Sequence, residues 1–98
     1  MRVFATTRFH KEIKKQLSET QEEQLDTFIA RLKKNDQRGK PLRGKWLYEV
    51  KLQGKRAYYV IFGEKALFVG VSDKKDQSAM IKGIVKRKEE YLAQLNIL

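Results

Sequence analysis

The chain contains no cysteine, one histidine and one proline among its 98 residues. The absence of cysteine excludes disulfides, a thiol nucleophile and cysteine-based zinc sites, and it fits a reducing compartment. The single histidine, His10, provides neither a metal cluster nor the second histidine of an acid–base pair. No Gly-x-x-x-x-Gly-Lys phosphate loop is present. We therefore expect no metal and no other cofactor.

Long apolar runs are also missing. No segment approaches the roughly 20 apolar residues that span a bilayer, and the first four residues are too short for the apolar part of a signal peptide. We therefore expect a cytoplasmic protein without a membrane partner. The length predicts a single domain over residues 1–98.

Positive charge is abundant and unevenly placed. The chain has 22 basic and 12 acidic side chains, which gives a formal charge of +10. Ten of the basic residues lie between Arg31 and Arg56, where the only acids are Asp36 and Glu49. Such a surface attracts polyanions, and nucleic acid is the first partner to consider. The alternative is a basic surface that only confers solubility.

Hydrophobic periodicity predicts an α+β fold with the order β-α-α-β-β-β-α. In this prediction an antiparallel sheet carries a helical hairpin on one face and a C-terminal helix, and its other face is partly open. The expected elements are a strand at 2–5, two helices within 9–35, strands at 46–52, 57–62 and 66–71, and a helix from about residue 78.

The helical hairpin is predicted from apolar residues four apart and from capping signals. Phe9, Ile13 and Leu17 share one face of the first helix. Thr20 and Glu23 have the spacing of a capping box at the start of the second helix. Residues 35–45 are polar, rich in glycine and basic residues, and are predicted to form a loop.

Alternation in the strand at 46–52 predicts which side chains face the open side of the sheet. Trp46, Tyr48 and Val50 fall on one face, which we expect to pack on the helices. Glu49 and Lys51 then point to the open face, where RNA would lie. Glu49 is either a general base or, more simply, an ion-pair partner of a neighbouring cation.

With this order of elements, the segments "PLRGKWLYEVKL", "KRAYYVIF" and "ALFVGVSDKKDQ" resemble the RelE/ParE superfamily of toxins from type II toxin–antitoxin modules. The resemblance covers nearly the whole chain and is greatest to the branch that includes HigB and related phage proteins. It implies either an endoribonuclease that cleaves messenger RNA, commonly on the ribosome, or a gyrase inhibitor on the same fold. It also implies a cognate antitoxin as a protein partner. The competing class is a basic nucleic-acid-binding module without catalysis.

The resemblance also suggests site residues. It places Lys51 and Arg56 at the basic strand positions of the family, where Arg56 would clamp the scissile phosphate. Tyr58 and Tyr59 point to opposite faces of their strand, so we expect at most one in the core and the other free to stack on a base. The full set expected at the catalytic site is Lys51, Arg56, Tyr58, Tyr59, Lys74 and Lys75, and the further RNA-binding set is Lys40, Arg43, Lys45 and Arg87.

Overall fold

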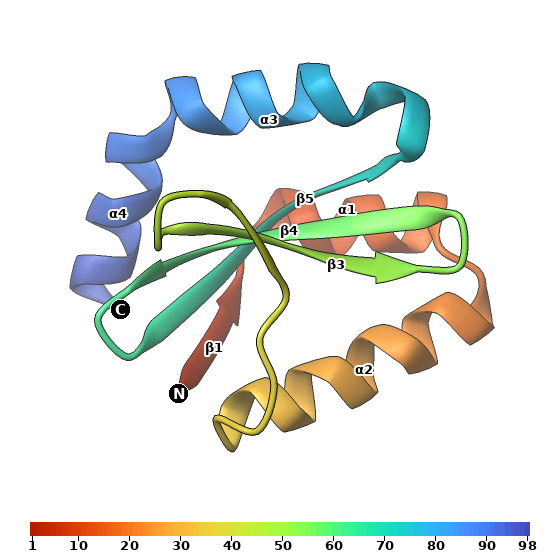
Figure 1. Cartoon of the computed structure of the whole chain (residues 1–98), viewed down its shortest axis with the longest axis horizontal. Helices are drawn as coiled ribbons and strands as arrows, with labels where there is room; N and C mark the ends of the chain where they lie inside the picture. The colour runs from red at the N-terminus through yellow and green to blue at the C-terminus, as the bar shows by residue number, and fades with distance from the viewer.

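The computed structural model describes residues 1–98 as an α+β fold built on one five-stranded mixed sheet with four α-helices (Figure 1). The elements in chain order are β1 (Arg2–Ala5), α1 (Thr7–Gln16), α2 (Glu19–Lys33), β2 (Lys40–Arg43), β3 (Leu47–Leu52), β4 (Lys55–Phe62), β5 (Lys65–Asp73), the 3₁₀ turn η1 (Lys74–Asp76), α3 (Gln77–Lys86) and α4 (Lys88–Ile97). The two predicted N-terminal helices, the first strand and the three-stranded meander are confirmed.

The sheet has the strand order β1-β5-β4-β3-β2. β2 to β5 pair antiparallel, but β1 pairs parallel with β5, so the prediction of an antiparallel sheet is wrong at this edge. The helical hairpin carries the chain away from β1, which allows β1 to enter beside the last strand in the parallel sense. Strand alternation alone does not reveal which edge the first strand joins.

The segment predicted as a loop contains β2. Lys40 and Pro41 pair with Glu49 and Tyr48 of β3, and the register shifts before Arg43. Proline is tolerated here because β2 is an edge strand, whose outer N–H groups need no partner within the sheet. The loop prediction is therefore wrong for residues 40–43.

The hairpin α1–α2 covers one face of the sheet and forms the larger core. Phe9 of α1 packs on Phe68, and Phe28 of α2 packs on Tyr59, with ring centroids 5.3 and 5.9 Å apart. Tyr59 also stacks on Tyr48 at 5.4 Å. The N-terminal helices are thus held to the sheet mainly by aromatic side chains.

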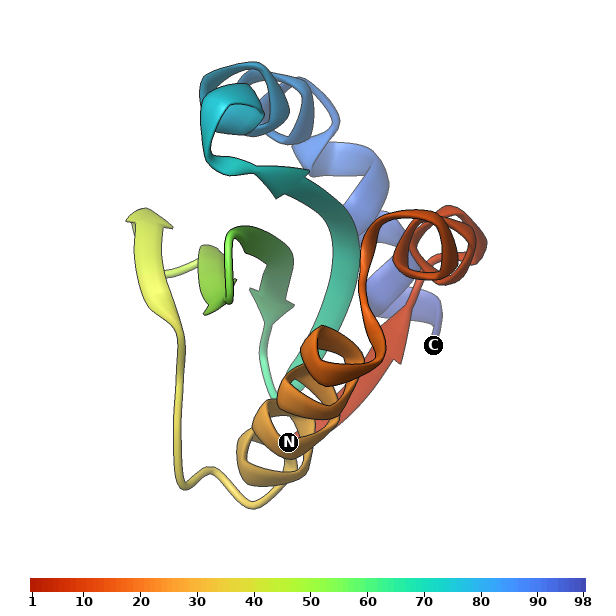
Figure 2. The same cartoon turned by 90° about the vertical axis from the view of Figure 1, so that its right-hand side faces the viewer.

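The opposite face is covered by α3 and α4, in contrast to the partly open face that the sequence predicts. Ile84 of α3 and Leu95 of α4 are buried against Tyr58, Val60 and other side chains of β3 to β5. In Figure 2, α3 lies above the strands and α2 below them. The predicted single C-terminal helix is two helices, because the backbone leaves helical geometry at Arg87. This break lets both helices fold onto the same face.

Trp46 also departs from the prediction. It lies in the turn before β3 and packs with the second core, on the α3–α4 side, rather than with Tyr48 and Val50. Its indole ring lies under the ammonium group of Lys88, 4.7 Å from the ring centroid. The contact joins the β2–β3 turn to the start of α4.

The N-cap residue of the second helix, Ser18, lies two residues before the predicted N-cap, Thr20. Ser18 accepts a hydrogen bond from the backbone N–H of Gln21, and the Gln21 side chain accepts one from the backbone N–H of Ser18. The capping box is therefore Ser18–Gln21, and the Thr20–Glu23 prediction is wrong. None of the four α-helices is long and apolar enough to span a membrane.

Candidate nucleic-acid interface

A row of polar side chains crosses three strands on the sheet face that also carries α3. The strand register places Lys51 of β3 opposite Arg56 of β4, and Arg56 opposite Ser72 of β5. Lys51 is exposed, Arg56 is partly buried and Ser72 is buried. The sequence predictions for Lys51 and Arg56 therefore converge on neighbouring positions at one end of the sheet.

Arg56 is fixed by a carboxylate from the neighbouring strand. Its Nη1 donates to Oε1 of Glu49 at 3.2 Å, in the only ion pair of the structure. The Glu49 side chain is 1% exposed, and its other oxygen accepts a hydrogen bond from the amide of Gln77 at the start of α3. Glu49 lies on the predicted face of β3, but it is buried rather than open to solvent. This geometry matches the ion-pair interpretation of Glu49.

The guanidinium of Arg56 keeps unused donors. The structure records one hydrogen bond from it, the bond to Glu49, and its buried Nε has no partner. A guanidinium has five N–H groups in a planar fork that suits phosphate oxygens. An anion at this end of the sheet would satisfy donors that the protein itself leaves free.

Both tyrosines are fully buried, so the prediction that one of them is free to stack on a base is wrong. Tyr59 faces α1 and α2, and its hydroxyl accepts a hydrogen bond from the backbone N–H of Gly39 at 2.8 Å. Tyr58 faces α3, and its hydroxyl lies 2.8 Å from Oγ of Ser72. Helices on both sheet faces leave no open face for either ring.

Burial also changes the acidity of these tyrosines. It raises the pKa of Tyr58 above the ordinary 10.0, an effect that the hydrogen bond with Ser72 partly offsets and the charge of Glu49 reinforces. Burial likewise raises the pKa of Tyr59, and the hydrogen bond from Gly39 lowers it by a smaller amount. Both hydroxyls therefore stay protonated near neutral pH.

Lys74 and Lys75 lie on η1, directly after β5 and two to three residues beyond Ser72, and both are exposed. The turn is capped by Asp73, whose carboxylate accepts from the backbone N–H of Asp76 at 3.2 Å. Partial desolvation raises the pKa of Asp73, but the hydrogen bonds from Asp76 and the charges of Lys55 and Lys75 outweigh it, so this pKa lies below the ordinary 3.8. Neither Lys74 nor Lys75 takes part in an ion pair.

The further basic residues divide between two places. Lys40 and Arg43 are exposed on β2, and Lys45 is exposed on the turn between β2 and β3. The contact of Trp46 with Lys88 connects this turn to α4. Arg87 lines a groove with Arg8 of α1, on the β5 side of α3. The structure therefore groups Lys40, Arg43 and Lys45 on one segment and separates Arg87 from them.

Two residues of the site, Ser72 and Gln77, were not predicted from the sequence. Gln77 holds Glu49, and Ser72 contacts Tyr58. Gln77 is the last residue of the segment "ALFVGVSDKKDQ", one of the three that carry the family resemblance, but it was assigned no role from the sequence. Ser72 carries no signal beyond its place near the end of a strand.

No group of three or more His, Cys, Asp or Glu side chains lies close enough to hold a metal ion. The groups that gather at this end of the sheet are the buried carboxylate of Glu49, the guanidinium of Arg56, several lysine amines and the carboxylate of Asp73 that caps η1. No protein-family model, curated protein or solved structure matches this chain.

Proposed function

We propose that this chain is a toxin of a type II toxin–antitoxin module, of the RelE/ParE kind, that cleaves messenger RNA without a metal ion. The support is the resemblance in sequence together with the order of the elements, in which a strand and a helical hairpin precede an antiparallel meander. Fold alone does not select a function, so the residues of the site must carry the proposal.

The observation that carries it is the Arg56–Glu49 pair. In a molecule with 22 basic side chains, the one ion pair fixes an arginine at the end of the sheet where Lys51 and Lys74 remain free. A guanidinium held in one orientation presents its remaining donors at a defined place, which transition-state stabilisation requires. A basic surface that serves only solubility needs no such arrangement.

The chemistry follows from the groups present. The ribose 2′-hydroxyl gives its proton to water and its oxygen forms a bond to the adjacent phosphorus, while the P–O5′ bond breaks and the leaving 5′-oxygen takes a proton from water. The products are a 2′,3′-cyclic phosphate and a 5′-hydroxyl end. Arg56, Lys51 and Lys74 offset the charge that develops on the phosphate oxygens, an effect of about 10²–10³ in rate for one donor. Glu49 acts here by positioning Arg56, because both of its oxygens are already hydrogen bonded.

The test uses exposed lysines, whose removal leaves the core unchanged. Lys51→Ala and Lys74→Ala should each reduce cleavage of a translated messenger RNA by about tenfold or more, and should weaken growth arrest on induction. Lys11→Ala removes an exposed lysine of α1 outside this cluster and should leave both readouts unchanged. Wild-type cleavage by the Lys51→Ala/Lys74→Ala double variant would refute the assignment of this site.

One observation favours the non-catalytic alternative. With Tyr58 and Tyr59 buried, no aromatic ring lies in the row of Lys51, Arg56 and Ser72 to hold an unpaired base. A pure binding module would retain RNA without forming cyclic phosphate ends, and the same assay measures both. Growth arrest with intact messenger RNA and inhibited DNA supercoiling would indicate the gyrase-inhibiting function instead.

A further inference from the structure

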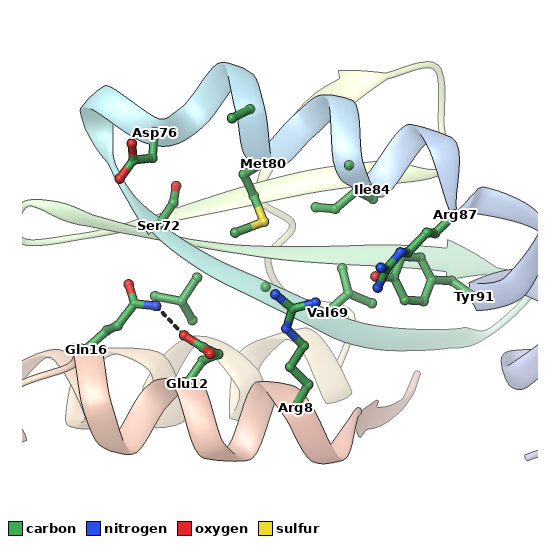
Figure 3. A pocket seen from close by; sticks show the side chains of 14 residues that line it. Arg8, Glu12, Gln16, Val69, Ser72, Asp76, Met80, Ile84, Arg87 and Tyr91 are labelled. Carbon is green, nitrogen blue, oxygen red and sulfur yellow. Dashed lines mark hydrogen bonds between the residues drawn. The ribbon is translucent and has the colours of Figure 1, made fainter.

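A groove of about 500 Å³ runs along β5 between α1 and α3 (Figure 3). It exists because β1 is short. β1 pairs with residues 65–68 of β5 only, so the second half of β5 has no strand on that side. The groove volume lies within the range of about 300–1,000 Å³ that is usual for ligand sites.

The base of the groove is an unpaired strand edge. No hydrogen bond from outside the sheet reaches the backbone of residues 69–72. Gly70, Val71 and Ser72 pair with β4, whereas Val69 lies at the register shift and has no partner there. From Gly70 to Ser72 such an edge presents alternating N–H and C=O groups over about 10 Å for three residues. An extended peptide supplies the complementary alternation, and a nucleic-acid backbone does not.

The middle of the groove is apolar. Val69 and Val71 come from β5, and Met80 and Ile84 come from α3. Gly83 adds room on the α3 wall, since a Cβ at this position would meet no atom within 4 Å. Alternate side chains of an added strand would find an apolar surface here.

The two ends of the groove carry opposite charges. Arg8 from α1 and Arg87, at the break between α3 and α4, reach toward the groove from opposite walls beside Tyr91, as Figure 3 shows. Neither arginine takes part in an ion pair, and the structure records no hydrogen bond from either side chain. The other end has Asp76 and Gln16, and Glu12 lies between Arg8 and Gln16 and accepts a hydrogen bond from Gln16 (Figure 3).

We propose that this groove binds an extended acidic peptide segment of a partner protein, which adds as a strand to β5 and places a carboxylate between Arg8 and Arg87. An acidic peptide is complementary in charge to the two arginines of the groove. It is also complementary to the whole chain, which carries a formal charge of +10. Main-chain hydrogen bonds provide the affinity, and the arginines and the apolar middle select the sequence. The proposal does not depend on RNA cleavage, since Arg8 and Arg87 are outside the proposed catalytic site.

The experiment uses a defined set of fluorescent peptides of about six residues with alternating apolar positions. One pool carries Asp or Glu at either end, and a matched pool carries Lys at the same positions. Fluorescence anisotropy should show binding of the acidic pool and at least about tenfold weaker binding of the lysine pool, because charge-assisted hydrogen bonds to the arginines are lost. Amide hydrogen exchange of residues 69–72 should slow when the best acidic peptide is bound.

Two controls separate strand addition from general attraction to a basic protein. Arg8→Ala/Arg87→Ala should weaken binding of the acidic peptide by about tenfold or more. Lys82→Ala/Lys86→Ala removes two exposed charges of α3 that do not line the groove, and it should leave the binding unchanged. A backbone N-methylated copy of the peptide should also lose binding.

The proposal is overturned if acidic and lysine pools bind equally, if the N-methylated copy binds as well as the parent, or if both double variants weaken binding alike. Binding of a short RNA oligonucleotide that is lost only in Arg8→Ala/Arg87→Ala would assign the groove to RNA and would also overturn it. Circular dichroism of each variant checks that the fold is retained.

Discussion

Arg56 is both a candidate ligand for phosphate and a part of the fold. Its side chain is 13% exposed, and Glu49 opposite it is 1% exposed. Arg56→Ala leaves the Glu49 carboxylate buried with Gln77 as its only partner, and we expect it to destabilise the protein by about 3–5 kcal/mol. Urea denaturation measures this change. Loss of activity in Arg56→Ala therefore does not by itself identify a catalytic residue.

A double variant distinguishes a buried charge from lost packing. Replacing both partners, in Arg56→Met/Glu49→Leu, should cost less than Arg56→Ala alone, because no uncompensated charge remains in the core. An equal or greater loss in the double variant would show that the pair contributes through packing or through Gln77.

The buried tyrosines predict a loss of stability at alkaline pH. The pKa values of Tyr58 and Tyr59 in the folded protein lie above the ordinary 10.0. Their contribution is fully present below about pH 10 and is lost as pH rises through the raised values, because the unfolded chain releases these protons first. The free energy of unfolding should fall in that range, and Tyr58→Phe/Tyr59→Phe should flatten the fall. Ultraviolet titration should show part of the tyrosine ionisation displaced to higher pH than in the unfolded chain, and Tyr58→Phe/Tyr59→Phe should remove that part.

At the scale of elements, the attachment of β2 depends on a glycine. A Cβ on Gly39 would meet the backbone carbonyl of Glu49, which is fixed in the β2–β3 pairing. Gly39→Ala should therefore destabilise the protein by about 1–3 kcal/mol, measured by chemical denaturation. Gly83→Ala is the matched control: its site is open and helical, so it should stabilise by about 0.5–1 kcal/mol. Equal effects of the two substitutions would contradict this account of β2.

The start of α2 gives a second test at this scale. Ser18→Ala removes the side-chain acceptor of the capping box and should cost about 1 kcal/mol in thermal or chemical unfolding. Thr20 lies inside the helix, one residue past its first position, and Thr20→Ala should be nearly neutral. A larger loss at Thr20 would restore the capping box that the sequence pattern suggests.

Sequence patterns predict the helices and strands in which apolar residues recur at regular spacing. They miss the elements that form only because another part of the fold offers a place for them. The hairpin and the meander follow from residues such as Phe9, Ile13 and Val60, which repeat at helical or strand spacing. β2 is four residues with a proline, and it exists because β3 offers a free edge. The break at Arg87 likewise depends on both C-terminal helices reaching one sheet face, which is a tertiary requirement.

The sequence suggested which residues belong to the candidate site, but not how buried they are or which side chains contact them. Lys51 and Arg56 were selected through the family resemblance, and the strand register of the structure places them opposite one another on β3 and β4. Their surroundings depend on where α3 and α4 lie. Those helices bury Tyr58 and bring Gln77 to Glu49, and no local pattern specifies either contact.

At the scale of the whole molecule, 22 basic side chains form a single ion pair with the 12 acids. Association with RNA should therefore be dominated by counterion release, so that the logarithm of the affinity falls linearly with the logarithm of salt concentration. Lys51→Ala or Lys74→Ala should each reduce the slope by about 1, measured by filter binding over a salt series. A slope near zero for the wild type would exclude the basic surface as the RNA-binding face.

The parallel pairing of β1 with β5 has a consequence for how the chain reaches this fold. Arg2 pairs with Lys65, so the first strand synthesised waits for the last strand before it can enter the sheet. Until then the aromatic side chains of α1 and α2 have no complete sheet to pack against. Contacts between residues so far apart in the sequence form slowly. Closing the β1 edge should be a late step, and a chain shortened before β5 should expose apolar surface and self-associate.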